Sequence, residues 1–237
     1  MPHLRDRPLS LVRAPDGIDG QLFFQKHEER AKVPAAEELP VELHPGHAAL
    51  LVANNARAVV GLVQIGVIEL HTWNAVSADL GHPDRMIFDL DPDPALEWSR
   101  MIEAPQLLKV VLDEFGLASF PKTSGDKGLH IVVPLTGGQD WENVKAFSKC
   151  VAKHMQRVVL SRFTAVSGPR NRVGKIFIDY LRNAKGATSV AAYSVRARPG
   201  MGVSMPVAWG ELPSLRSAHE WTMQSALARQ RRLGGDA

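Results

Sequence analysis

The chain has 237 residues, of which 45% are hydrophobic and 22% are charged, with a formal net charge of +3. This length suits one domain or two tightly joined lobes. No apolar run approaches the roughly 18 residues that a membrane-spanning helix needs, and residues 1–7 lack the apolar segment of a secretory signal. The single cysteine, Cys150, excludes an internal disulfide framework and a cysteine zinc site, so we expect a reducing cytoplasm and no membrane association.

The two ends of the chain carry opposite charge. Residues 1–142 contain 12 Lys/Arg against 21 Asp/Glu, a net charge of −9, whereas residues 143–237 contain 16 against 4, a net of +12. A carboxylate-bearing part joined to a basic part suits a metal-dependent enzyme that acts on polyphosphate or nucleic acid. The alternative is that folding interleaves the two sets over the surface.

The first elements form a predicted hairpin. Residues 8–13 and 21–26 read as strands joined by a glycine-containing turn. Phe23 and Phe24 are adjacent and must point to opposite faces, so at most one of them can fill a core from one face. The other is either covered by a second layer or is an exposed ring that could stack on a base. Residues 27–47 read as a polar loop, residues 48–65 as a helix, and residues 66–71 as a strand that ends at His71.

The next strand carries two carboxylates. Apolar residues from 86 onward lead to Asp89 and Asp91, whose side chains share one face of a strand, while Leu90 points into a core and Pro92 ends the strand. Two unpaired carboxylates on one face repel each other unless a cation lies between them, which indicates a divalent metal site. The alternative is a strand that runs into an ordinary acidic turn.

A helix and a polar turn follow. Residues 93–115 read as a helix capped by Asp93, kinked or split at Pro105, and ended by Gly116. Residues 117–135 read as two strands around a turn at 124–128. The Ser124 hydroxyl, the Lys127 ammonium and the free backbone N–H groups of that turn suit phosphate oxygens, although such turns also join ordinary hairpins. His130 lies on the strand that leaves the turn.

The last third of the chain repeats the pattern of a strand that ends in a carboxylate. After a predicted amphipathic helix from Asp140 to about residue 160, an apolar strand over 173–182 ends with Asp179, and Arg182 follows it. Residues 188–195 read as a further strand, beyond which Arg196 and Arg198 share a face if the strand continues. Residues 209–237 read as a helix-prone tail with a basic cluster.

Together these features meet the needs of two-metal nucleotidyl transfer. Three carboxylates hold two divalent ions roughly 3.5 to 4 Å apart, and these ions activate a primer 3′-hydroxyl and clamp a triphosphate. Basic side chains neutralise the charge that builds on the phosphates in the transition state.

The sequence also resembles a known family, the polymerase domain of bacterial ATP-dependent DNA ligase D. This domain is a member of the archaeo-eukaryotic primase superfamily and is used in non-homologous end joining. The resemblance covers nearly the whole chain. It is carried by residues 7–13, 23–27, 62–64, 69–74, the Phe-Asp-Leu-Asp-Pro motif at 88–92, 123–130, 179–183, 186–188 and 193–200.

The resemblance implies one primase-polymerase domain over residues 1–237, with an α/β (α+β) fold and a primase-like palm of mixed or antiparallel sheet flanked by helices. It implies two Mn²⁺ or Mg²⁺ ions and nucleoside triphosphates, often ribonucleotides, as substrates. The implied partners are DNA ends or gapped DNA, with Ku and a ligase acting in trans, in the bacterial cytoplasm at the nucleoid. The implied site residues are Asp89, Asp91 and Asp179 as metal ligands, Ser124, Lys127 and His130 for the triphosphate, Arg196 and Arg198 for further nucleotide contacts, His71 and Arg182 lining the same site, and Phe23, Phe24, Arg13 and Lys26 for DNA.

Two departures from the family pattern stand out. Asp126 occupies a position where family members usually have glycine, and it either adds negative charge beside the phosphate site or points to solvent. The chain also begins some tens of residues into the family domain, so we expect weakened recognition of a DNA 5′-phosphate. The alternatives are a stand-alone primase of the same superfamily and a truncated, weakly active DNA-binding module.

Overall fold

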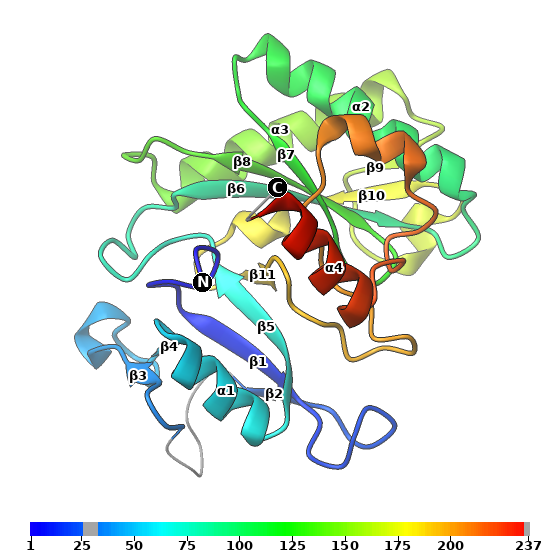
Figure 1. Ribbon diagram of the computed structural model, residues 1–237. Coiled ribbons are helices and arrows are strands. Elements are labelled where there is room, and N and C mark those ends of the chain that lie inside the picture. Colours follow the sequence, from blue (N-terminus) through cyan, green and yellow to red (C-terminus); the bar gives the residue numbers. More distant parts are fainter. Residues whose placement is uncertain (26–32, 235–237) are drawn as a thin grey trace.

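The computed structural model describes residues 1–25 and 33–234, which form two sheets with helices packed around them (Figure 1). The first sheet has the order β11 (Thr188–Val190), β5 (Val67–Trp73), β1 (Leu9–Arg13) and β2 (Phe23–Gln25), and all its pairs are antiparallel. β1 and β2 form the predicted hairpin. Helix α1 (Ala56–Gln64) covers this sheet through a core that includes Leu9, Leu11 and Leu62.

The second sheet has the order β7 (Phe120–Thr123), β8 (Leu129–Pro134), β6 (Arg85–Pro92), β10 (Ile176–Asp179) and β9 (Phe163–Thr164). The β9–β10 pair is parallel and the other pairs of this sheet are antiparallel, so the sheet is mixed, as predicted. Its back face, which carries Phe88, Leu90 and Ile131, packs against α2 (Trp98–Glu114) and α3 (Trp141–Val158). Its front face, which turns toward the first sheet, carries Asp89 and His130 together with apolar residues such as Ile87 and Val132.

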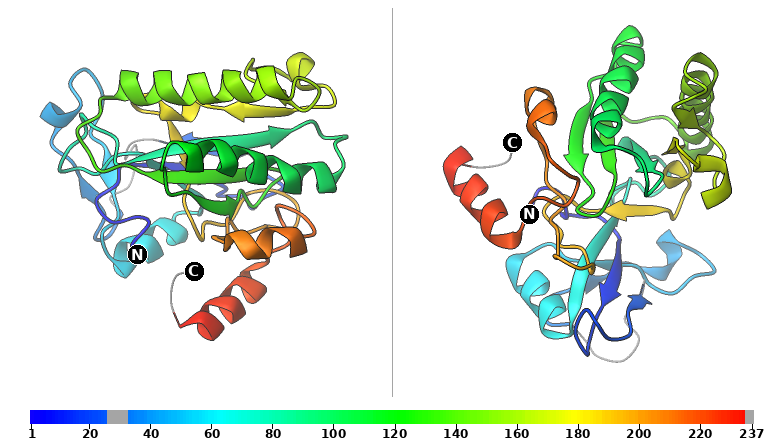
Figure 2. Two further views of the ribbon diagram at one scale, coloured as in Figure 1. Left: turned by 90° about the horizontal axis from the view of Figure 1, so that it is seen from above. Right: turned by 90° about the vertical axis from the view of Figure 1, so that its right-hand side faces the viewer.

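The smaller elements complete the chain. Strands β3 (Glu37–Glu38) and β4 (Leu51–Val52) pair with each other, and α4 (Met223–Leu233) lies on the opposite side of the molecule from α3 (Figure 2). The described ranges also contain the 3₁₀ helices η1 (Val41–Leu43), η2 (Pro169–Arg172), η3 (Leu181–Asn183) and η4 (Trp209–Ser214). No helix in these ranges is long and apolar enough to cross a bilayer.

Three predicted helices begin later than expected. Residues 51–52 form a strand, and α1 starts after Asn55, whose side chain accepts a hydrogen bond from Ala58 N–H. Asp93 does not cap α2, because its N–H pairs with Lys175 and its carboxylate accepts the Ala95 N–H within a turn, so α2 starts at Trp98. The tail forms η4 first, and α4 starts only at Met223.

Other boundaries also differ from expectation. Pro105 is buried inside an unbroken α2, so it does not split the helix, while Gly116 ends it with a φ of +68° as predicted. The predicted polar loop at 27–47 contains β3 and η1. The strand expected over 188–195 ends at Val190, so Arg196 and Arg198 do not extend a strand. Arg229, which belongs to the basic cluster of the tail, is buried and paired with Glu211 at 2.5 Å.

Candidate active site

Four polar side chains form a row across the front face of the second sheet. Lys122 is the direct cross-strand neighbour of His130, His130 of Asp89, and Asp89 of Asp179. Direct cross-strand neighbours point to the same face with their Cβ atoms about 5 Å apart. The register of β6 with β10 therefore brings the two predicted carboxylates together, although they are ninety residues apart in sequence.

Asp89 and Asp179, two of the three predicted metal ligands, share one arginine. Arg182 Nε lies 3.6 Å from Asp89 Oδ2 and 3.2 Å from Asp179 Oδ2. His130 Nε2 lies 3.4 Å from Asp89 Oδ1, and Asp179 accepts a hydrogen bond of 2.8 Å from Leu181 N–H. Burial raises the pKa of Asp89 to about 6. The charge of Arg182 opposes this shift, and the charges of Asp179 and Asp91 add to it. Burial also raises the pKa of Asp179.

The third carboxylate, Asp91, lies on the same face two residues beyond Asp89. It forms ion pairs with Arg172 from η2 and with Lys127 Nζ, the latter at 3.2 Å. Arg172 is only 17% exposed at its side chain, and sequence reasoning assigned it no role. Nothing in the 169–172 segment distinguishes it from other surface arginines, so only the fold identifies it as a contact of Asp91.

The donor set fits hard divalent cations, because three carboxylates with oxygen ligands gather on one face and two of them have raised pKa values. In the described part of the chain, no three Asp, Glu, His or Cys side chains are close enough as placed to share one ion. Arg182, Arg172 and Lys127 pair with the carboxylate oxygens instead. A metal held by Asp89, Asp91 and Asp179 therefore requires these basic side chains to move away.

The turn at residues 124–128 packs closely on β6. The Ser124 hydroxyl accepts hydrogen bonds from Asp126 N–H (3.2 Å) and Gly128 N–H (3.1 Å), which closes the turn. Gly125 has a φ of +73°, and a Cβ there would lie 2.8 Å from the Arg196 side chain. A Cβ on Gly128 would overlap the carbonyl oxygen of Leu90, so only glycine allows the turn to lie against the strand of Asp89 and Asp91.

A buried carboxylate that sequence reasoning missed connects two predicted site residues. Glu69 lies 2.6 Å from His71 Nε2 and 3.1 Å from Arg196 Nε, and it accepts a hydrogen bond of 2.8 Å from Ala197 N–H. Burial opposes its charge, but these partners together lower the pKa of Glu69 to about 2. Burial lowers the pKa of His71 despite the hydrogen bond to Glu69. The signal was the i, i+2 spacing of Glu69 and His71 on one strand face.

The two predicted nucleotide-binding arginines meet Asp126. Its Oδ2 lies 4.0 Å from Arg196 NH2 and 3.7 Å from Arg198 Nε, so Asp126 faces the site and the expectation that it points to solvent is wrong. Arg196 also donates to the Ser124 carbonyl at 3.1 Å. Arg196 therefore contacts the turn through both the Ser124 carbonyl and the Asp126 carboxylate, and Arg198 contacts it through the Asp126 carboxylate.

Of the predicted DNA-contacting residues, Phe24 lies in one cross-strand row with Val12 and Glu69, on the same face of the first sheet. Phe23 and Phe24 are 43% and 81% exposed on β2, so neither fills a core. Arg13 donates to the Ile65 carbonyl (3.0 Å) and to Gln25 (3.1 Å), and these contacts do not involve the carboxylates. Lys26 lies outside the described residues.

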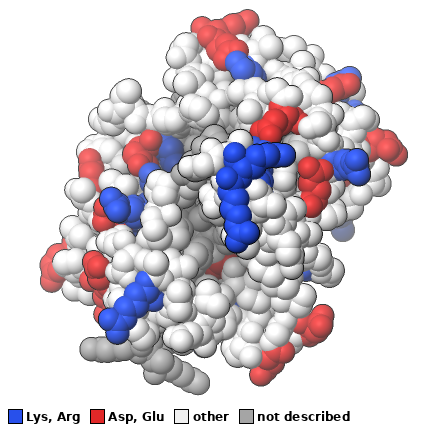
Figure 3. All heavy atoms as spheres, viewed as in Figure 1, with Lys and Arg blue, Asp and Glu red and all other residues white. Residues whose placement is uncertain are grey.

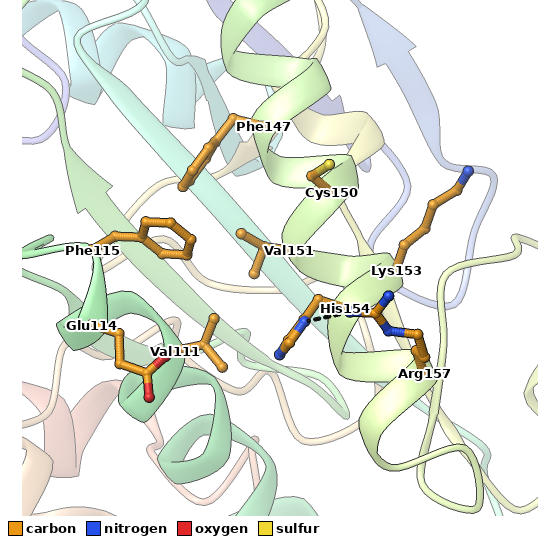
Figure 4. A pocket seen from close by; sticks show the side chains of 9 residues that line it. All are labelled: Val111, Glu114, Phe115, Phe147, Cys150, Val151, Lys153, His154 and Arg157. Atoms are coloured by element: carbon orange, nitrogen blue, oxygen red, sulfur yellow. Dashed lines mark hydrogen bonds between the residues drawn. The ribbon is translucent and has the colours of Figure 1, made fainter.

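A cavity of about 420 Å³ lies away from this site. It is between α2 and α3 on the back of the second sheet, where Val111 and Phe115 from one helix approach Phe147 and Val151 from the other (Figure 4). No residue of the carboxylate row lines it. Concave volume alone would therefore place the chemistry on the wrong face of the sheet.

Surface charge is interleaved over much of one face of the molecule, with a group of basic side chains beside a hollow in its middle (Figure 3). The sequence-level separation of charge therefore does not become two halves of opposite sign on this face. At the site itself the acidic and basic sets meet directly, since Asp89, Asp91 and Asp179 pair with Arg172 and Arg182.

Comparison with known proteins identifies the family of this chain. The family model described as LigD, primase-polymerase domain, matches residues 1–237. The non-homologous end joining protein LigD of Pseudomonas aeruginosa is 57% identical over 98% of this chain, which spans 28% of that protein. LigD of Mycobacterium tuberculosis is 29% identical over 99% of this chain, which spans 33% of it.

A solved structure of the polymerase domain of Mycobacterium tuberculosis ligase D in complex with DNA is also similar. It superposes with a TM-score of 0.89 at 28% identity, over 98% of this chain and 84% of that one. The fold and site therefore define a primase-polymerase type of domain. The chain belongs to the LigD primase-polymerase domain family, as the sequence resemblance predicted.

Proposed function

We propose that this chain is a metal-dependent polymerase that transfers a nucleotide from a nucleoside triphosphate to a DNA 3′-hydroxyl at breaks or gaps in end joining. The observation that carries the proposal is the alignment of Asp89 with Asp179 across β6 and β10, with Asp91 two residues away on the same face. Residues of both sheets contribute to the site, so we further propose that residues 1–237 act as one domain.

In this proposal Asp89, Asp91 and Asp179 hold Mn²⁺ or Mg²⁺, which when bound lowers the pKa of the attacking hydroxyl and stabilises charge on the phosphates. Lys127 and Arg172 leave Asp91 and become free to bind phosphate oxygens. Arg196 and Arg198 exchange the Asp126 carboxylate for the triphosphate, because a polyphosphate carries more charge than one carboxylate.

The buried Glu69 supports this role of Arg196. It holds the guanidinium and the His71 imidazole in place before substrate arrives, which reduces the entropy lost on binding. Phe23 or Phe24 provides an exposed ring for stacking on DNA, and Arg13 and Lys26 are proposed to lie near its phosphates. The relatives are non-homologous end joining proteins, which supports DNA ends as substrate, and we propose Ku and a ligase as partners in trans.

A primer-extension assay on gapped DNA tests the proposal. We expect Asp89→Ala to abolish nucleotide addition, whereas Asp93→Ala, which removes a carboxylate just beyond the same strand, should retain most of it. Assays with rNTP against dNTP and with Mn²⁺ against Mg²⁺ define the substrate and metal preference. Full activity in Asp89→Ala would refute the mechanism, and salt-sensitive DNA binding without any incorporation by the wild type would favour a DNA-binding module.

A further inference from the structure

A cavity of about 210 Å³ lies between the two sheets. Its lining is mostly apolar and includes Ile87, Val132 and Phe120, but it also contains Arg85, Lys122, Ser189 and His3. It begins at Lys122, which ends the row of the active site, and continues away from Asp89 toward the start of β6 and β7. None of the three carboxylates lines it. The volume is smaller than the about 300 to 1,000 Å³ of sites for drug-sized ligands.

Two positive side chains line this cavity, and among the described residues neither forms an ion pair with a carboxylate. Lys122 is 6% exposed and donates to the Val190 carbonyl at 2.9 Å and the Ser204 hydroxyl at 2.8 Å, which leaves one N–H of its ammonium. Arg85 donates to the Thr72 hydroxyl, to the Trp73 carbonyl at 3.0 Å and to the Asn74 side chain. Every acceptor described for either cation is neutral.

Asp84, which precedes Arg85 in the sequence, is already paired with another arginine. Asp84 forms a two-pronged ion pair with Arg7, with distances of 2.8 and 2.6 Å. Burial, and then the charge of Arg7, lower the pKa of Arg85 to about 9, and burial followed by the charge of Arg85 holds the pKa of Lys122 well below its usual value. The charge of Asp84 opposes the shift of Arg85 and the charge of Asp89 opposes that of Lys122, but burial outweighs both.

A buried hydroxyl completes the lining. Ser189 is 4% exposed, and its hydroxyl has no hydrogen-bond partner among the described residues. Ser189 is the direct cross-strand neighbour of Thr72, which accepts from Arg85, and the next residue, Val190, accepts from Lys122. The Ser189 side chain therefore lies on the same sheet face as the Thr72 hydroxyl that binds Arg85, and an unpaired buried donor is costly.

We propose that this cavity binds a small oxyanion of the phosphate class, held by Lys122, Arg85 and Ser189. Such an anion would accept hydrogen bonds from the ammonium, the guanidinium and the hydroxyl, and would supply the missing negative charge. The cavity can hold a phosphate-sized group but is too small for a nucleoside triphosphate. None of its three ligands is a proposed metal or triphosphate contact, although Lys122 is the cross-strand neighbour of His130.

Orthophosphate titration tests the proposal, with binding measured by calorimetry and by the shift in Tm. The double variant Lys127→Ala/Arg198→Ala is used as background, since it removes phosphate contacts at the active site. We expect saturable binding to persist in this background. Adding Ser189→Ala should weaken it about tenfold, the value of one hydrogen bond to a charged group, and adding Lys122→Met should abolish it.

Ser10→Ala is the matched control, because Ser10 is also a buried hydroxyl without a described partner but does not line this cavity. It should leave phosphate affinity unchanged. If Lys122→Met does not fold, Ser189→Ala decides the question alone. The absence of saturable phosphate binding in the background variant, or binding that is unaffected by Ser189→Ala, would overturn the proposal and leave Arg85 and Lys122 as cross-links between the sheets.

Discussion

The substitution Glu69→Gln removes one buried negative charge while keeping the shape of the side chain. Glu69 is 4% exposed and is the shared partner of His71, Arg196 and the Ala197 N–H. Glutamine is neutral, so in the variant no negative charge at position 69 balances the positive charge of the Arg196 guanidinium. We expect lower stability together with weaker nucleotide binding, because Arg196 is no longer held in place.

The magnitude follows from the pKa of Glu69, which falls from 4.5 to about 2 on folding. One pKa unit corresponds to about 1.4 kcal/mol, so the ionised carboxylate contributes roughly 3 kcal/mol at pH 7. Because the folded pKa is the lower one, this contribution is complete above about pH 4.5 and is lost as the pH falls toward 2. The gap between wild type and Glu69→Gln should therefore shrink by about 1 kcal/mol at pH 4 and about 2 kcal/mol at pH 3.

Urea unfolding followed by tryptophan fluorescence at pH 7, 4 and 3 measures this gap. Glu97→Gln serves as control, because Glu97 precedes α2 with an exposed side chain that makes no capping hydrogen bond. Its unfolding free energy should stay within about 0.5 kcal/mol of wild type at pH 7. A Glu69→Gln effect below about 1 kcal/mol at pH 7, or a gap that does not change with pH, would contradict the assignment of Glu69 as a stabilising buried anion.

Three further predictions concern the site. Gly128→Ala should lower the unfolding free energy by about 2 kcal/mol and reduce nucleotide addition, because its Cβ would overlap a β6 carbonyl, whereas Gly210→Ala, with open space around it, should match wild type in urea unfolding. Arg172→Met should reduce primer extension by about a hundredfold, while Arg170→Met, its exposed neighbour, should not. The raised pKa of Asp89, about 6, predicts that Mn²⁺ affinity measured by calorimetry rises from pH 5 to pH 7 and then levels off, and equal affinity at both pH values would refute this.

Local patterns in the sequence were sufficient for much of the second sheet. The alternation around Asp89 and Asp91 predicted their common face, and the apolar run before Asp179 predicted a strand that ends in a carboxylate. The glycines at 125 and 128 predicted the turn. These features depend only on strand periodicity and on the φ values that glycine allows.

Helix starts and chain ends were less predictable, because tertiary contacts compete with local signals. Asp93 has the sequence of a helix cap, but its backbone pairs with Lys175, more than eighty residues away. The basic cluster of the tail gave no sign that Arg229 reaches back to Glu211 and is buried. In both cases the partner comes from another element that local sequence cannot identify.

The sequence by itself determined which residues could carry the chemistry, since strand periodicity and residue type alone pick out three strand-end carboxylates, a glycine-bounded turn and several arginines. Only the tertiary structure decided which of them meet. The pairing register of β6 and β10 places Asp89 opposite Asp179, and the fold brings Glu69 to Arg196, Arg172 to Asp91 and Asp126 to Arg198. Register and contacts between distant elements depend on the packing of both partners, which neither segment specifies alone.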